Sequence, residues 1–324
     1  MSFVKHQQVD LQKNLLLAHY KFPRSQHLRE AFEWMVTDYY AKASLEEPFE
    51  ARGILLTGPT RIGKSTEARK LLAELNDGST LMPDGRPVNF TSVTLDGHVT
   101  WRDLGIHTLR TGLSYKMERR RRLSQRDYWD KVLFQAKAQG VVGIHYDECQ
   151  HIFSKKGPEA RAMILDSFKS MLKQPDWPFM LLLSGIGELA ERIQEEEQLA
   201  HLLRPVTFRE IDVHQVGDLN ELNSLCHAYA ERAGYDFANL SSVDFYRRLG
   251  LACGFSWGLV VELMIAVLIN AGSVGAKTLS PELFCGAFTT RLELAPGFSP
   301  FTVDDYEELF LANKILDLWN KSKS

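Results

Sequence analysis

The sequence predicts an α/β protein in which helices flank a parallel sheet, followed by a small all-helical domain. Between about residue 50 and residue 185, short apolar runs alternate with helical patterns, as in parallel strands joined by crossover helices. The first apolar run, Gly53–Thr57, leads directly into a glycine-rich loop and a helical segment. After about Arg209 the strand signals stop and only helical patterns follow. These three observations separate an α/β core from a helical region behind it.

Hydrophobic periodicity places the individual elements. Near the N-terminus Leu28, Phe32, Met35 and Val36 recur at helical spacing, which predicts a helix. In the core, strands are predicted at residues 53–57, 88–95, 141–146 and 179–184, and helices at 65–75, 102–116, 125–139 and 159–173. Beyond the core, helices are predicted at residues 214–233, 241–253, 258–271 and 280–292.

These elements divide the chain into four parts. They are an N-terminal helical segment (residues 1–50), the α/β core (51–212), a helical domain (213–297) and a C-terminal tail (298–324). The tail carries acidic and aromatic residues, among them Asp304, Tyr306 and Phe310. We therefore expect it to be either a docking segment for a partner or a last packed helix.

Composition excludes several classes of protein. The chain has 324 residues, 44% of them hydrophobic and 24% charged, with a formal net charge of -3, so it is not a globally basic nucleic-acid binder. Its four cysteines form no CxxC pair, which argues against a disulfide framework or a zinc site. The N-terminus lacks an apolar signal sequence, and the most apolar stretch, residues 258–271, contains Glu262 and Asn270 and is too short to cross a bilayer. We expect a cytoplasmic protein with no membrane partner.

The glycine-rich loop matches the phosphate-binding pattern G-x-x-x-x-G-K-[ST]. It consists of Gly58, Pro59, Thr60, Arg61, Ile62, Gly63, Lys64 and Ser65, with Thr66 following. The glycines let backbone N–H groups turn toward phosphate oxygens, and the next helix adds the positive end of its dipole. Lys64 is expected to reach the β- and γ-phosphates, and the Ser65 hydroxyl to ligate Mg²⁺. A chance match is the alternative, but the strand before the loop and the helix after it favour nucleotide binding.

A second motif ends the apolar run at residues 141–146. Asp147 and Glu148 follow this run, at the carboxyl end of a predicted strand, where open parallel sheets bind their ligands. Asp147 is expected to hold Mg²⁺ and Glu148 to polarise the attacking water. A solvated strand end is the alternative for this motif taken alone. His145, Cys149 and His151 lie nearby, but their spacing matches no standard metal site.

Three further residues are candidates for the same chemistry. Ser184 ends the next predicted strand and is a candidate polar contact near the γ-phosphate; the alternative is an ordinary serine at a strand-to-turn junction. An arginine from a neighbouring subunit often completes such sites. Arg204 is the favoured candidate and Arg192 the other, and a surface arginine is the alternative for both.

One run of the sequence is strongly basic. Its basic residues are Lys116, Arg119, Arg120, Arg121 and Arg122; Arg126 extends the run, and Arg102 lies in the segment just before it. On one surface they could neutralise several phosphates of a DNA duplex, which predicts salt-sensitive binding without sequence preference. A solvated helix face is the alternative for a basic run of this kind.

Together these stretches resemble the TnsC/TniB family of AAA+ ATPases, the regulators of DNA transposition. The resemblance runs from about Tyr20 to Gly286 and is carried by HYKFPR at 19–24, GPTRIGKST at 58–66, YDECQH at 146–151, LSGIGEL at 183–189 and the segment 198–204 that ends in Arg204. It implies an AAA+ P-loop NTPase core followed by a helical lid domain, with ATP and Mg²⁺ as cofactors. It also implies a homo-oligomer, a ring or a filament, on double-stranded DNA, with residues 97–126 facing the DNA. The implied partners are a TniQ-type target selector and the transposase subunits.

One departure from the broader AAA+ pattern concerns the lid. Many AAA+ lids place a nucleotide-contacting arginine at the start of a late helix, whereas the matching stretch here, residues 254–258, reads GFSWG. We therefore expect a slow, regulatory ATPase. Two other readings remain open: a signalling or secretion AAA+ ATPase that does not act on DNA, and an interaction scaffold with a degenerate site. The presence of Lys64, Ser65, Asp147 and Glu148 argues against the scaffold.

Overall fold

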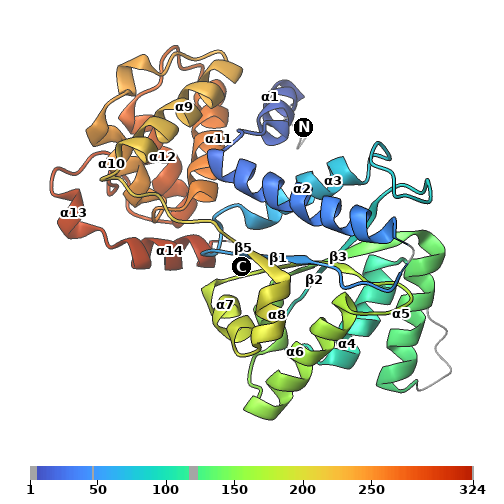
Figure 1. The fold of residues 1–324 in the computed structure, drawn as a ribbon. Helices are drawn as coiled ribbons and strands as arrows, with labels where there is room; N and C mark the ends of the chain where they lie inside the picture. The colour runs from blue at the N-terminus through green and yellow to red at the C-terminus, as the bar shows by residue number, and fades with distance from the viewer. Residues whose placement is uncertain (1–5, 46, 117–122, 323–324) are drawn as a thin grey trace. The chain divides into compact units, whose positions relative to one another are not determined.

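The computed structural model describes residues 6–45, 47–116 and 123–322 (Figure 1). The chain forms two compact units. One unit is Pro23–Phe208, and the other combines Met1–Phe22 with Arg209–Ser324. The expected N-terminal segment, residues 1–50, is thus divided between the two units.

The first unit is built on a five-stranded parallel sheet. Its strands are β1 (Gly53–Thr57), β2 (Asn89–Thr94), β3 (Val141–Asp147), β4 (Met180–Gly185) and β5 (Leu203–Thr207), in the order β2-β3-β4-β1-β5. Every residue of β1, β3 and β4 is buried, because helices cover both faces of the sheet. The predicted α/β fold with a parallel sheet is confirmed.

Helices form a layer on each side of this sheet. Figure 1 shows α2 (Pro23–Ala43) and α3 (Lys64–Leu75) on one face. The other face carries α4 (Trp101–His107), α5 (Gln125–Gln139), α6 (Pro158–Leu172), α7 (Gly187–Gln194) and α8 (Glu197–Leu202). A capping box of Ser124 and Asp127 starts α5, and Gly140, at a φ of 68°, ends it in the left-handed conformation. The helices predicted at residues 65–75, 125–139 and 159–173 are confirmed to within a residue.

Two elements differ from the sequence-based expectation. The edge strand β5 was not predicted, because Arg204, Pro205 and Thr207 point to solvent and break the apolar run that marks a buried strand. The helix expected at residues 102–116 ends sooner, since α4 stops at His107 and is followed by a π-helical turn, Thr108–Gly112. In this turn the Thr108 hydroxyl donates to the Leu104 carbonyl and lies 2.9 Å from the Tyr146 hydroxyl of β3.

The second unit is all helical. It contains α1 (His6–Leu17), α9 (Val216–Arg232), the 3-10 turn Ala238–Leu240, α10 (Val243–Ala252), α11 (Trp257–Ser273), α12 (Pro281–Leu292), α13 (Tyr306–Leu309) and α14 (Ala312–Lys321). Its core includes an aromatic cluster of Phe237, Phe245, Phe284 and Phe301. The four helices predicted beyond residue 213 are confirmed with small shifts at their ends.

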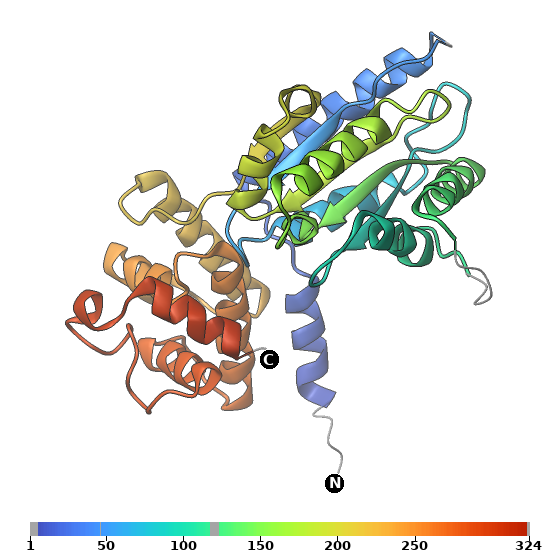
Figure 2. The same ribbon diagram turned by 90° about the horizontal axis from the view of Figure 1, so that it is seen from below.

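The described part of the C-terminal tail is packed rather than free. Helix α14 packs against α10 and α12 (Figure 2). Its side chains Ile315 and Trp319 are buried, and the Trp319 indole donates to the Ala252 carbonyl at 3.0 Å. Of the two expectations for residues 298–324, the structure therefore favours the last packed helix.

Among the described residues, no single helix has the length and apolarity to cross a membrane, although α10 and α11, bent by 103° at their junction, meet that test as a pair.

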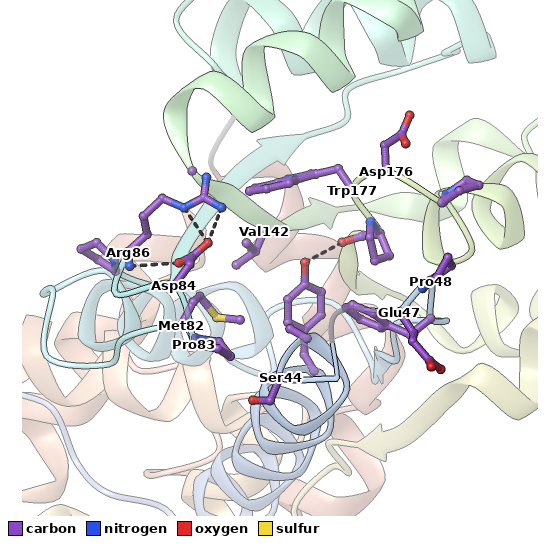
Figure 3. Close-up of a pocket in the computed structure, with 17 residues that line it drawn as sticks. Ser44, Glu47, Pro48, Met82, Pro83, Asp84, Arg86, Val142, Asp176 and Trp177 are labelled. Carbon is purple, nitrogen blue, oxygen red and sulfur yellow. Dashed lines mark hydrogen bonds and ion pairs between the residues drawn. The ribbon is translucent and has the colours of Figure 1, made fainter.

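A cavity of about 680 Å³ lies at the amino edge of the sheet (Figure 3). Gly140 and Val142, at the start of β3, line it together with Pro178, which precedes β4. On its walls Arg86 pairs with Asp84 and lies over the Trp177 ring, 4.8 Å from the centroid. Ligands of parallel sheets bind at the carboxyl edge, so this cavity is separate from the phosphate-binding loop.

Candidate nucleotide-binding site

The phosphate-binding loop joins β1 to α3 and depends on two glycines. Gly58 has a φ of 154°, and a Cβ there would lie 2.4 Å from the Phe208 carbonyl oxygen. Gly63, at a φ of 107°, is left-handed and directly precedes α3. Residues with side chains are strained in both conformations, so the two glycines fix the path of the loop. Pro59, Thr60, Arg61 and Ile62 lie between them, and Lys64, Ser65 and Thr66 form the first turn of α3.

The Lys64 ammonium is held inside this loop. Its Nζ donates to the carbonyls of Gly58 at 2.7 Å and Pro59 at 2.8 Å. Burial lowers the pKa of Lys64, while the carboxylates of Glu148 and Asp147 act in the opposite direction. The loop therefore holds a buried ammonium group that is hydrogen-bonded to two carbonyl oxygens. Phosphate oxygens can replace these carbonyls as the acceptors of its hydrogen bonds.

Asp147 ends β3 and receives several hydrogen bonds. The Ser184 hydroxyl, from β4, donates to Asp147 Oδ1 at 2.6 Å, and the Glu148 backbone N–H donates to the same atom at 3.0 Å. Burial acts to raise the pKa of Asp147, but hydrogen bonds from Ser184 and Ser65 outweigh it, so the pKa lies below its usual value. Asp147 is therefore ionised at neutral pH.

A hydrogen-bond chain continues from Ser184 across the sheet. His145 is fully buried on β3, with Nε2 2.8 Å from Ser184 Oγ and Nδ1 2.9 Å from Ser92 Oγ on β2. Burial lowers the pKa of His145 to about 4, so the ring is neutral. The single Ser184 proton points to Asp147, so Nε2 must donate to Ser184 and Nδ1 must accept from Ser92. All donors in the chain point toward Asp147.

Glu148 follows Asp147 in a constrained conformation. Its φ of 56° is left-handed, which is uncommon for a residue with a side chain. Its Oε2 accepts a hydrogen bond from the Gln150 amide at 2.6 Å. The charges of Glu148 and Asp147 both act to raise the pKa of Lys64, so the two carboxylates and the ammonium share one site.

The predicted Mg²⁺ ligands fit a magnesium ion. The Ser65 hydroxyl is hydrogen-bonded to the ionised Asp147 carboxylate, so two oxygen donors already lie together. Mg²⁺ prefers oxygen ligands and commonly takes few from the protein, with water and substrate phosphates completing its shell. Within the described residues, no group of three or more His, Cys, Asp or Glu side chains is arranged to hold a metal.

The predicted arginines lie away from this cluster. Arg204 pairs in register with Ile54, near the start of β1, and its guanidinium lies over the Trp34 ring, 5.6 Å from the centroid. The phosphate-binding loop follows the other end of β1, so Arg204 does not face its own subunit's loop. Arg192 of α7 forms ion pairs with Glu188 on the same helix and with Glu195, which directly follows it. A role for either in a neighbouring subunit stays a prediction.

The structure also shows two residues beside the site that the sequence did not single out. Arg24, at the start of α2, donates to the Ile62 carbonyl within the loop at 3.0 Å. Gln150 contacts Glu148, as described above. Both residues were visible only as single letters of longer stretches, Arg24 at the end of HYKFPR and Gln150 within YDECQH, with no role of their own.

Part of the predicted DNA surface lies on α4 and α5. The Arg102 guanidinium lies over the Tyr128 ring, 5.4 Å from the centroid, which places it beside the first turn of α5, where Arg126 is 90% exposed. Lys116 follows Tyr115, whose ring contacts Lys131 of α5. Arg119, Arg120, Arg121 and Arg122 lie outside the described residues.

Comparisons with known proteins agree with this arrangement. Residues 47–193 match the family model described as AAA domain. The chain has no significant match among curated proteins. Among solved structures it is similar to Cdc6p from Pyrobaculum aerophilum, with a TM-score of 0.59 and 12% identity over 89% of this chain and 72% of that chain.

Two further similar structures come from Aeropyrum pernix. The ORC1 protein in complex with DNA gives a TM-score of 0.56 and 13% identity, covering 96% of this chain and 86% of that chain. The ORC2 protein with ADPNP and ADP gives a TM-score of 0.54 and 14% identity, covering 86% of this chain and 72% of that chain. At these identities the likeness concerns the fold.

An AAA domain implies ATP binding, usually with Mg²⁺, and Lys64, Ser65 and Asp147 occupy the positions for it. Residues 47–193, which contain the P-loop, therefore match an AAA domain, and the parallel sheet with its flanking helices has the AAA+ fold.

Proposed function

We propose that this protein is a slow, regulatory ATPase that controls DNA transposition. It assembles on double-stranded DNA as a homo-oligomer, a ring or a filament, and links a TniQ-type target selector to the transposase subunits. The observation that carries the ATPase part is the meeting of Lys64, Ser65, Asp147 and Glu148 at the carboxyl edge of the sheet. Lys64 and Ser65 begin α3, Asp147 ends β3 and Glu148 follows it.

Each residue has a separate task in hydrolysis. Lys64 exchanges the carbonyls of Gly58 and Pro59 for phosphate oxygens and neutralises their charge. Bound Mg²⁺ would supply further neutralisation of the phosphates, held by Ser65 and Asp147. Glu148 accepts a hydrogen bond from the attacking water and orients it toward the γ-phosphate. Ser184 keeps Asp147 in place by its 2.6 Å hydrogen bond.

Three observations support the DNA part of the proposal. The motifs at residues 19–24, 58–66 and 146–151 resemble those of the TnsC/TniB family. Arg102 of α4 lies beside the first turn of α5, which carries Arg126. A protein of similar fold, ORC1 from A. pernix, was solved in complex with DNA.

The proposal is tested by binding to a fluorescent DNA duplex with ATP and Mg²⁺, with ADP, and without nucleotide. We expect binding only with ATP, together with a rise in particle mass by light scattering. A plot of the logarithm of the association constant against the logarithm of the salt concentration should be linear, with a slope of about -0.9 for each phosphate contacted. ATP hydrolysis without DNA binding under any condition would instead favour a signalling or secretion ATPase.

A charge-matched pair of variants locates the DNA surface. Replacing Arg102, Lys116 and Arg126 with glutamine should weaken binding and lower the salt slope. The control replaces three exposed bases of the helical unit, Arg247, Lys277 and Lys314, and changes the net charge equally. Equal losses in the two variants would show that only the net charge matters and would contradict a contact surface on α4 and α5.

A further inference from the structure

Gln150 connects the ends of two neighbouring strands. It lies in the 3-10 turn Cys149–Ile152 that follows Glu148. Its amide Nε2 donates to Glu148 Oε2 at 2.6 Å, and its Oε1 accepts from the Ile186 backbone N–H at 3.3 Å. The oxygen of this amide is therefore bonded to the turn between β4 and α7, and its nitrogen is bonded to the Glu148 carboxylate, which follows β3.

The neighbouring residue Gly185 makes room for this contact. A Cβ at Gly185 would lie 2.4 Å from Gln150 Oε1 and 2.9 Å from Leu189 Cδ2. Gly185 does not have a positive φ, so its backbone conformation does not require glycine. A side chain at this position would therefore have to displace the Gln150 amide.

We propose that Gln150 is a positioning residue for Glu148. The backbone of Glu148 is fixed by its left-handed φ and by its N–H bond to Asp147, and Gln150 fixes the carboxylate plane. With Oε2 occupied by the amide, Oε1 is the oxygen that accepts from the attacking water. This inference rests on the proposed role of Glu148 in ATP hydrolysis, where small errors in the placement of a reacting group reduce the rate strongly.

The sharpest test is Gln150→Glu. This substitution keeps the shape of the side chain and an oxygen for the Ile186 N–H, but it replaces the donor to Glu148 with a second carboxylate. We expect kcat to fall by about 10- to 100-fold, as for a misplaced catalytic group, with KM within about twofold of the wild type. The affinity for a fluorescent ATP analogue and the melting temperature should be unchanged.

A second readout does not depend on turnover. ADP with aluminium fluoride mimics the transferred phosphoryl group with its attacking water, so its binding depends on a correctly placed Glu148. Gln150→Glu should weaken this complex by about the same factor as it lowers kcat, because both report stabilisation of the transition state.

A matched glycine pair tests the geometry without changing Gln150. Gly185→Ala places a methyl group against the amide and should reproduce the loss of kcat. Gly187→Ala is the control, because a Cβ there meets no atom within 4 Å. It should leave kcat unchanged.

The outcomes separate this inference from the proposed function. If the wild type hydrolyses ATP, Glu148→Gln does not, and Gln150→Glu keeps full kcat and full affinity for ADP with aluminium fluoride, the positioning role is wrong and the ATPase stands. If Glu148→Gln retains full activity, the water-activating role of Glu148 fails, and the inference fails with it. Lower kcat in both Gln150→Glu and Gly185→Ala, with intact ATP binding, supports the inference.

Discussion

Replacing Ser184 with alanine removes the central link of the hydrogen-bond chain between β2 and the end of β3. In the wild type the Ser184 hydroxyl donates to Asp147 Oδ1 at 2.6 Å and accepts from His145 Nε2 at 2.8 Å. Both Ser184 and His145 are buried, at 0% and 1% exposure, so water cannot replace the lost hydroxyl without entering the core. The substitution therefore leaves both neighbours short of a partner.

The size of the effect follows from these two bonds. A hydrogen bond to a charged group contributes about 1.5–3 kcal/mol, and a buried donor left without a partner costs about 1–3 kcal/mol. The two terms share one hydroxyl and are not fully additive. We expect Ser184→Ala to lower the free energy of unfolding by about 2–4 kcal/mol at pH 7.5 without nucleotide.

The pH dependence of this loss has a definite sign. The pKa of Asp147 is depressed in the folded protein, so ionised Asp147 stabilises the fold above its unfolded pKa, and this stabilisation disappears as the pH falls through the folded pKa. Ser184→Ala raises that folded pKa. The difference in the free energy of unfolding between variant and wild type should thus be constant near neutral pH. It should shrink in the acidic range where Asp147 becomes protonated. Buried His145 destabilises both proteins as the pH falls below about 6.5, so the two are compared at each pH.

Urea unfolding followed by tryptophan fluorescence measures the effect, because four of the six tryptophans lie in the unit Pro23–Phe208. Ser170→Ala is the control, since the exposed Ser170 hydroxyl bonds only to the Asp166 carbonyl of its own helix. Surface changes of this kind stay within about 0.5 kcal/mol. A loss of stability for Ser184→Ala no larger than that of the control would refute the hydrogen-bond chain.

Four other substitutions test the fold and the site. Lys64→Ala should abolish binding of a fluorescent ATP analogue and ATP-dependent assembly, and normal assembly by light scattering would contradict its role. Glu148→Gln should lower kcat at least about 10²-fold while ATP binding and assembly persist; loss of assembly would indicate a structural role. Gly143→Ala places a Cβ 2.1 Å from the Phe90 ring and should cost about 1–3 kcal/mol in urea unfolding, so a neutral result would contradict the packing. Arg204→Ala should be inactive alone and regain part of its ATPase activity when mixed with Glu148→Gln subunits, which still bind ATP and assemble; no recovery would count against action between subunits.

The sequence predicted those parts of the site that are contiguous in the chain. The loop Gly58 to Ser65 and the pair Asp147 and Glu148 were visible because each motif needs fixed residue types at fixed spacing, next to an apolar strand. The buried strands were visible for a similar reason, since burial on both faces produces continuous apolar runs. The edge strand β5 is half exposed and carries no such run.

The contacts between strands could not be predicted in the same way. His145 meets Ser92, 53 residues earlier, and Ser184, 39 residues later, only because β2, β3 and β4 are neighbours in one register. A serine and a histidine within strands carry no signal of that pairing. The hydrogen bond from the Ile186 backbone N–H to Gln150 likewise depends on two strand ends meeting at one edge of the sheet.

The single proton of Ser184 places a limit on its predicted role near the γ-phosphate. In the structure that proton is donated to Asp147, and His145 occupies an acceptor site of the same hydroxyl. Ser184 can therefore donate to a phosphate oxygen only by releasing Asp147, which changes the orientation of a predicted Mg²⁺ ligand. The Nε2–H of His145 limits the rotation of the hydroxyl and favours the bond to Asp147. On this geometry the main task of Ser184 is to orient Asp147, and any contact with the γ-phosphate competes with that task.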